Sequence, residues 1–161
     1  MTQRSNRPVD WNTLVTENEK LLYRAALAML GSRQEAEDAV QDAFVTYLEK
    51  APADLREPSA WLMRVLVNRC RDMLRSPRRG STLPLWEDLS APGPEERQEL
   101  EELYALPPKD RAVIHLHYCE GWPTADIARI LGVREGTVRS RLSRARQRLR
   151  QLLQEEATGN E

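Results

Sequence analysis

The apolar residues of this chain recur at the intervals of amphipathic helices, and no segment shows the alternation that predicts a β-strand. Residues 12–30 form the first such segment, and Gly31 follows at the position where helices commonly end. Ser32 then precedes a second segment, and Glu35 completes a capping-box pattern at its start. This second helix is predicted to run to about Lys50, where an Ala-Pro pair stops it.

A third helix is predicted from Pro58 to about Arg75, and a proline-rich segment follows it. Further helices are expected near residues 95–106, 108–120, 123–131 and 135–154, with a frayed tail after them. The sequence therefore predicts an all-α protein of two small helical bundles joined by a flexible linker. We expect the first bundle, the linker and the second bundle to span residues 9–75, 76–94 and 95–154.

The most specific local pattern lies in the second bundle, where three residues have the offsets of a helix-turn-helix. Ala128 is small enough to let a second helix approach the first. Gly132 can form the turn, and Val138 can anchor the second helix to the first. Together these positions predict a helix-turn-helix.

The second helix of this motif has one apolar side and one polar side. The predicted buried stripe is formed by Val138, Leu142, Ala145, Leu149 and Leu152. The opposite side carries Ser140, Ser143 and Gln147, flanked by Arg139 and Arg144. Arginine can bind guanine edges in the major groove, and serine can bond to several bases. An isolated basic helix is often merely solvated, but within a helix-turn-helix this face predicts contact with duplex DNA, with flanking phosphate contacts from Arg141, Arg146, Arg148 and Arg150.

The second helix of the chain presents acidic and apolar residues on the same exposed side. Its apolar stripe is predicted to contain Ala36, Ala39, Val40, Ala43, Phe44, Tyr47 and Leu48. The opposite side carries Asp38, Gln41, Asp42, Val45 and Glu49. Solvation alone explains the acids, but it explains less well the valine at their centre. An acidic rim around a small apolar contact suits a basic protein partner.

The third helix combines a buried stripe with a basic side. The stripe is predicted to contain Leu62, Met63, Leu66, Val67, Cys70, Met73 and Leu74. The other side carries Trp61, Arg64, Asn68, Arg71 and Arg75. Basic residues beside an aromatic ring suit single-stranded nucleic acid, through phosphate contacts and base stacking. The alternative is that Trp61 packs against the first helix and the arginines are only solvated.

Charge is distributed unevenly although the net charge of the 161 residues is only −1. Residues 51–79 carry +4 and residues 107–150 carry +6, whereas residues 80–106 between them carry −6. Two basic segments separated by an acidic one suggest two modules that face polyanions and a linker that avoids them. No apolar run predicts membrane insertion or a secretory signal. The two distant cysteines, Cys70 and Cys119, fit a cytoplasmic protein.

No pattern supports catalysis or a bound cofactor. His115 and Cys119 lie four residues apart, so both can face a metal on a helix, but structural zinc normally needs four ligands. Packing is therefore the favoured interpretation, and we predict no catalytic residue, no metal and no cofactor. Two alternatives stay open: a stand-alone helix-turn-helix regulator, and a metal-dependent nuclease, for which no ligand cluster is evident.

Three stretches together resemble the extracytoplasmic-function sigma factors, which belong to the sigma-70 family of bacterial initiation factors. Residues 21–50 resemble the start of that family's region 2, residues 61–75 its DNA-melting part, and residues 106–149 its region 4. The resemblance extends over residues 10–152 and has both modules in the family's order. It implies a dissociable RNA polymerase subunit that directs promoter-specific initiation, in the cytoplasm and without membrane insertion.

The resemblance also implies roles for matching positions. Core polymerase would bind Asp38, Gln41, Asp42 and Val45. The unwound −10 strand would bind Trp61, Arg64, Asn68 and Arg71, with residues 52–59 taking up an extruded base. The −35 duplex would bind Thr137, Arg139, Ser140, Ser143, Arg144 and Gln147. Glu87 and Asp88 would mimic RNA or simply be solvated, and an anti-sigma factor is an expected partner.

Overall fold

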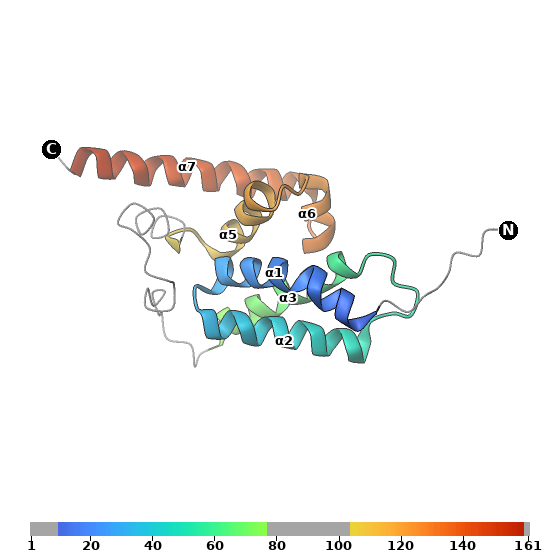
Figure 1. Cartoon of the computed structure of the whole chain (residues 1–161). Coiled ribbons are helices and arrows are strands. Elements are labelled where there is room, and N and C mark those ends of the chain that lie inside the picture. Colours follow the sequence, from blue (N-terminus) through green and yellow to red (C-terminus); the bar gives the residue numbers. More distant parts are fainter. Residues whose placement is uncertain (1–9, 77–103, 160–161) are drawn as a thin grey trace.

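The chain folds into two helical modules that pack against each other (Figure 1). In its computed structural model, residues 10–76 and 104–159 are described. The predicted linker beyond residue 76 and most of the helix predicted near 95–106 lie outside these residues, as do Glu87 and Asp88. The side chain of Leu152 is also outside the described part.

The N-terminal module consists of three helices whose bounds agree closely with those predicted. They are α1 (Trp11–Leu30), α2 (Arg33–Lys50) and α3 (Pro58–Arg75). All three pack on one another around a core of fully buried side chains, which includes Leu14, Leu22, Met29, Leu62, Met63 and Leu66. Burial of these apolar side chains stabilises the module.

The predicted helix caps are confirmed. Gly31 ends α1 in the left-handed conformation, with φ of 70°, and its N–H donates to the Leu27 carbonyl at 2.9 Å. A residue with a Cβ would be strained there. The Ser32 hydroxyl then accepts from the Glu35 N–H at 3.4 Å and starts α2. These caps fix the sharp reversal between α1 and α2.

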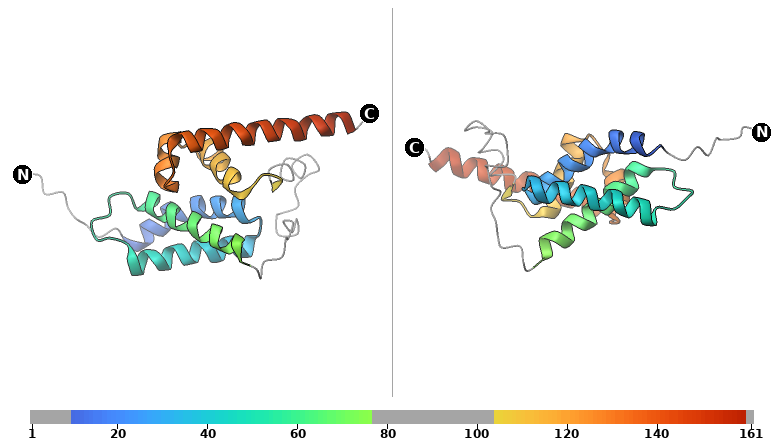
Figure 2. Two further views of the ribbon diagram at one scale, coloured as in Figure 1. Left: turned by 180° about the vertical axis from the view of Figure 1, so that it is seen from behind. Right: turned by 60° about the horizontal axis from the view of Figure 1, so that its bottom comes forward.

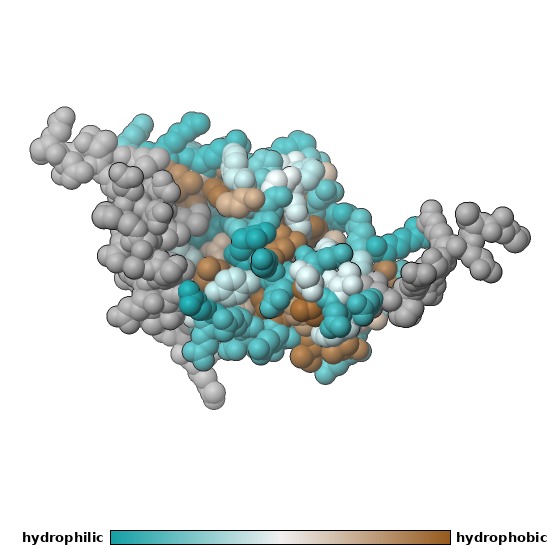
Figure 3. All heavy atoms as spheres, in the orientation of Figure 1, coloured by the Kyte–Doolittle hydropathy of each residue, from teal (hydrophilic) through white to brown (hydrophobic). Residues whose placement is uncertain are grey.

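One predicted core position of α2 is wrong. Leu48 is 66% exposed, whereas the sequence places it in the buried stripe. Tyr47 covers this end of the core instead, because its ring centroid lies 6.4 Å from that of Trp11 and 5.7 Å from that of Trp61. Leu48 is left beside Val45, which is 50% exposed. An apolar patch is visible over the C-terminal half of α2 (Figure 3).

The C-terminal module differs from its prediction at two places. It contains α5 (Pro108–Ile114), the π-helical turn η2 (His115–Cys119), α6 (Thr124–Leu131) and α7 (Glu135–Gly159). The helix predicted over residues 108–120 therefore ends in a π turn, in which the Glu120 N–H donates to the His115 carbonyl at 3.1 Å. Helix α7 also continues past residue 154 to Gly159, so the frayed tail is wrong up to that residue; its Gln, Glu and Ala residues favour helix.

Helices α5 and α6 lie between α7 on one side and the N-terminal module on the other (Figure 2). Helix α5 contacts α1, and α6 contacts α3. The buried apolar residues of both modules form a single cluster, with Met29 and Leu66 on one side and Val113 and Ile127 on the other. The modules are therefore continuous in their packing, an arrangement that helical periodicity alone does not reveal.

Candidate nucleic-acid and polymerase interfaces

The helix-turn-helix predicted from the sequence is present. Gly132 ends α6 with φ of 68° and ψ of 34°, and its N–H donates to the Ala128 carbonyl. Ala128 is buried, and Val138 at the start of α7 is completely buried. The three positions therefore have the structural roles that their spacing predicts.

Glu135, which was not predicted from the sequence, connects the start of α7 to α6. Glu135 accepts from the Thr124 hydroxyl at 2.9 Å and from Arg139 Nη2 at 2.7 Å. The hydrogen bond from Thr124, followed by that from Arg139, lowers the pKa of the Glu135 carboxyl. Arg139, one of the predicted DNA-binding residues, is thus already paired within its own helix. The signal for this ion pair in the sequence was an acidic residue four positions before an arginine.

The other predicted DNA-binding residues of α7 lie together on its outer side. Val138, Leu142 and Ala145 face the core and are buried. On the opposite side Ser140, Ser143, Arg144 and Gln147 are exposed, while Thr137 is half-buried. The helix therefore presents a row of hydrogen-bond donors that a major groove can accommodate.

The basic face of α3 lies partly exposed and partly covered. Arg64 and Asn68 are exposed, whereas Trp61 and Arg71 are half-buried. The ring of Trp61 meets Tyr47 edge to face, with 5.7 Å between centroids. Trp61 thus packs against Tyr47 of α2, and one part of it remains at the surface.

Two adjoining hollows of about 390 and 450 Å³ lie where the loop before α3 meets α6. Trp61 and Arg64 line one hollow and Trp122 lines the other, while Glu57 and Arg129 line both. Glu57 and Arg129 also form an ion pair between the two modules. The loop predicted to take up an extruded base is therefore in contact with α6.

The acidic face of α2 contains one ion pair that was not predicted. Asp42 accepts from Arg69 Nε of α3 at 2.7 Å, and both side chains are about half-exposed. Asp38, Gln41 and Val45 are exposed on the same helix. The face thus combines carboxylates with the apolar patch of Val45 and Leu48, and the prediction of a basic protein partner remains open to test.

The two histidines of the π turn contact different groups. His115 Nε2 lies 3.0 Å from Glu120 Oε1, and His117 Nδ1 lies 2.9 Å from the Trp122 carbonyl oxygen. Cys119 is exposed. Across residues 10–76 and 104–159, no group of three His, Cys, Asp or Glu side chains is placed to hold a metal ion. None of the helices in these ranges has the length and apolar character of a membrane span.

Comparison with known proteins identifies the family. Residues 14–80 match the family model for sigma-70 region 2, and residues 97–149 match that for sigma-70 region 4. The ECF RNA polymerase sigma factor SigM of Mycobacterium tuberculosis is 36% identical over 89% of this chain and 76% of its own length. SigL of the same species is 34% identical over 88% of both chains. SigW of Bacillus subtilis is 31% identical over 83% of both.

Solved structures agree with this relationship. The sigma factor RpoE of Bartonella quintana, in complex with the anti-sigma factor NepR, aligns with a TM-score of 0.66 and 26% identity over 90% of this chain and 97% of that chain. CnrH in complex with the cytosolic domain of CnrY aligns with a TM-score of 0.64 and 28% identity over 95% and 90%. The chain belongs to the ECF RNA polymerase sigma factors.

Proposed function

We propose that this chain directs RNA polymerase to a specific set of promoters as a dissociable subunit. The observation that supports this most strongly is the pairing, in one chain of this family, of a helix-turn-helix with an exposed polar face and a three-helix module with a basic face. Region 2 would span residues 9–75, the linker 76–94 and region 4 95–154. The polymerase would perform the chemistry in the cytoplasm, and this chain would supply recognition.

Region 4 would recognise the −35 duplex through α7. Arg139 and Ser140 would contact base edges, while Thr137 at the helix start would lie near a phosphate, where the helix N-terminus favours negative charge. Ser143, Arg144 and Gln147 would extend this contact along the groove. The supporting observation is that all of these side chains except the half-buried Thr137 are exposed on α7, whereas Val138 is buried in the core.

Region 2 would capture the unpaired −10 strand through α3 and the loop before it. Arg64 and Arg71 would contact phosphates, and Trp61 and Asn68 would contact bases. Extruding a base costs a few kcal/mol in lost pairing and stacking, roughly as in base flipping. Capture of the strand would offset this cost without ATP.

Regulation by an anti-sigma factor is part of the proposal. Two structural relatives, RpoE of B. quintana and CnrH, were each solved with a protein partner, which for RpoE is the anti-sigma factor NepR. Both align over at least 90% of this chain. We therefore expect an anti-sigma factor that binds this chain and competes with core polymerase.

The test is transcription in vitro on fragmented host DNA, with core polymerase in the presence and absence of this protein. Discrete new start sites that share an upstream two-part element are the expected result. Tight duplex binding by the protein alone, without new starts, would instead support a stand-alone regulator.

Arg139→Ala is expected to weaken initiation from promoters that need the −35 element by about ten-fold, because one base-reading contact is lost. Binding to core polymerase should be unchanged, since Arg139 lies on α7 and the proposed polymerase face lies on α2. Run-off transcription and a polymerase titration measure the two effects. Arg148→Ala is the matched control, because it removes a flanking phosphate contact. Such a contact contributes to DNA affinity without regard to the DNA sequence. If the Arg139 variant initiates as well as the unsubstituted protein, Arg139 does not contact the −35 bases.

Asp42→Arg is expected to lower the affinity for core polymerase by about ten-fold, because it reverses one of the charges of the acidic face. The substitution also breaks the ion pair with Arg69. Arg69→Ala breaks the same pair without reversing the face, and it should change polymerase affinity by about two-fold or less. A fluorescence titration of labelled protein with core enzyme distinguishes them. If both variants lose the same amount of polymerase affinity, the broken Asp42–Arg69 ion pair, rather than the reversed charge of the face, explains the loss.

A further inference from the structure

Helix α7 begins with a carboxylate that holds one of the proposed base-contacting arginines. Glu135 is the first residue of α7, and Arg139 lies about one helical turn further along it. Glu135 Oε1 accepts from Arg139 Nη2 at 2.7 Å. The Arg139 side chain is 67% exposed and that of Glu135 is 40% exposed. An exposed ion pair of this kind contributes little to the stability of a helix.

A second donor, from the preceding helix, distinguishes this pair from an ordinary exposed one. The Thr124 hydroxyl, at the start of α6, donates to the same Glu135 oxygen at 2.9 Å. Thr124 and Glu135 are both half-buried. The packing of α6 on α7 keeps these two residues together, because Ile127 and Val138 are completely buried in the shared core. The carboxylate is therefore anchored on the body of the module, and Arg139 is anchored through it.

The carboxylate of Glu135 is kept in its charged form. The hydrogen bond from Thr124, followed by that from Arg139, lowers the pKa of Glu135. Its place in the first turn of α7 also favours negative charge, because the N-terminal end of the helix dipole is positive. A charged acceptor makes a stronger hydrogen bond to an arginine than a neutral acceptor does. The contact with Arg139 is thus charge-assisted at neutral pH.

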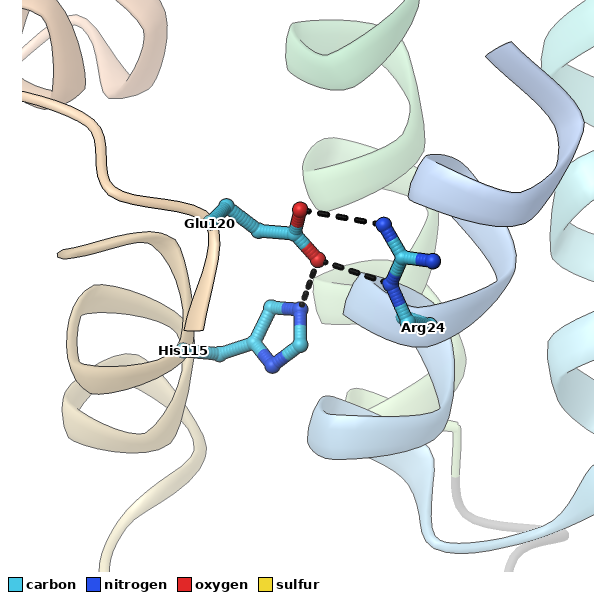
Figure 4. Close-up of polar contacts among 3 residues, drawn as sticks. All are labelled: Arg24, His115 and Glu120. Carbon is cyan, nitrogen blue, oxygen red and sulfur yellow. Dashed lines mark hydrogen bonds and ion pairs between the residues drawn. The ribbon is translucent and has the colours of Figure 1, made fainter. Parts of the chain in front are cut away.

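The C-terminal module contains a second carboxylate with two such partners, and it has a different setting. Glu120 Oε1 accepts from Arg24 Nε at 2.9 Å, and His115 Nε2 lies 3.0 Å from the same oxygen (Figure 4). That ion pair connects two modules of the chain, and the Glu120 side chain is only 9% exposed. Arg139 instead remains at the surface of α7 beside the exposed Ser140. An orientation imposed on Arg139 is therefore passed on to whatever α7 binds.

We propose that Glu135, anchored by Thr124, is a positioning residue that determines the base specificity of Arg139. The inference rests on the proposed function, in which Arg139 contacts a base edge of the −35 duplex. A bidentate contact to guanine requires the guanidinium to lie at one orientation to the base. The hydrogen bond to Glu135 uses one donor of the guanidinium and leaves other donors for the base. Arg139 thereby enters the groove already oriented, so less conformational entropy is lost on binding.

The same carboxylate also disfavours contacts that do not depend on the DNA sequence. An arginine without a partner samples many rotamers, and it can bind a phosphate as well as a base. Phosphate contacts add affinity for every DNA sequence alike. Glu135 holds Arg139 away from these alternatives, and its own charge repels phosphates. Loss of the carboxylate is therefore expected to reduce discrimination between bases without a matching loss of DNA affinity.

The experiment compares the base preferences of full-length variants bound to core polymerase. The template is a promoter identified by the start-site experiment, with each base of its −35 element randomised in turn. Sequencing of barcoded transcripts gives the preference at each position. Glu135→Gln keeps the shape of the side chain and removes its charge. Thr124→Val removes the anchoring hydroxyl at nearly constant volume, whereas Thr124→Ser keeps the hydroxyl.

Asp126→Asn is the matched control for the change in charge. Asp126 lies on α6, as Thr124 does, and its carboxylate is 3.7 Å from Arg129 Nη2. Its substitution therefore removes one negative charge from the same module without touching the contact between Glu135 and Arg139. Circular dichroism and thermal unfolding confirm that each variant is folded.

Arg139→Ala identifies the position that this arginine contacts, because the preference there is lost. At that position we expect discrimination to fall by about five-fold in Glu135→Gln and by about two-fold in Thr124→Val, while other positions keep their preferences. Thr124→Ser and Asp126→Asn should keep the original preference at every position. Initiation summed over the library should change by about two-fold or less in Glu135→Gln.

A double variant tests whether Glu135 acts through Arg139. Glu135→Gln should cause no further loss of discrimination in the Arg139→Ala background, because a positioning residue acts only through the residue that it positions. A further loss there, or a changed preference at another position, would show that Glu135 contacts a base itself. Either result would overturn the positioning role.

Two other results would also overturn it. An equal loss of initiation from every promoter in Thr124→Val would show that the network only stabilises the helix-turn-helix. Unchanged preferences in both Glu135→Gln and Thr124→Val would show that Arg139 needs no anchor. Failure of the proposed function is recognised separately, because the unsubstituted protein would then give no start sites with core polymerase, and that result would refute both.

Discussion

Arg111→Met is expected to lower the free energy of unfolding by about 3 kcal/mol or more, because it removes donors from at least three largely buried carbonyls. These are the carbonyls of Ala28, Met29 and Leu106, and the last accepts from Arg111 Nη1 at 2.8 Å. Methionine keeps much of the volume and supplies no donor. The modules are then expected to separate, since water can reach the end of α1 only when they do. Urea denaturation measures the first effect, and the distance between spin labels at Lys50→Cys in α2 and Gln151→Cys in α7, which are both exposed positions, measures the second.

Two further substitutions isolate the reason for this loss. Arg111→Lys keeps the charge, but an ammonium lacks the planar fork that bonds several carbonyls at once, so we expect an intermediate loss. Arg129→Met removes an exposed ion pair with Glu57, and its effect on unfolding should be much smaller. If Arg111→Met were no more destabilising than Arg129→Met, the hydrogen bonds from Arg111 to the end of α1 would not contribute to stability.

The helices and the helix-turn-helix were predictable because their signals are local. Gly31 and Gly132 each end a helix in the left-handed conformation, and Ser32 caps the next one, all within a few residues of the pattern that predicts them. The buried stripe of α3 follows from helical spacing in the same way. Such features depend on the backbone conformation of a short segment and on a single apolar face.

The interdomain contacts were not predictable in this way. Arg111 bonds to carbonyls more than eighty residues earlier in the chain, and Arg24 pairs with Glu120 across 96 residues. Nothing in the neighbourhood of Arg111 distinguishes it from an arginine on a solvated helix. Its role depends on which helix end is brought beside it, and that is a property of the tertiary packing.

The π turn and the position of Leu48 show a second limit of structure prediction from apolar periodicity. The apolar pattern of residues 108–120 fits an α-helix and an α-helix ending in a π turn equally well, because only one residue is added to the hydrogen-bonded ring. At the end of α2, Leu48 and Tyr47 were both assigned to the apolar stripe. The ring contacts of Tyr47 with Trp11 and Trp61 decide which one is covered.

Val138→Asp is expected to abolish binding of the −35 duplex, with a loss of more than about 100-fold, because it places a carboxylate in the core of the helix-turn-helix. Val138 is completely buried, and an unpaired charge at such a site costs about 4 kcal/mol or more. Helices α6 and α7 should therefore lose their packing. Helices α1, α2 and α3 have many core residues of their own, so polymerase binding through α2 should persist.

Ser140→Asp is the matched control for this prediction. Ser140 is exposed on α7, so the same acidic group there leaves the core intact while it repels DNA phosphates. Both variants should bind the −35 duplex poorly, and hydrogen exchange distinguishes the causes. Protection in α6 and α7 should fall for Val138→Asp and remain for Ser140→Asp. Retained protection in both variants would show that the helix-turn-helix tolerates the buried charge, and it would contradict the anchoring role of Val138.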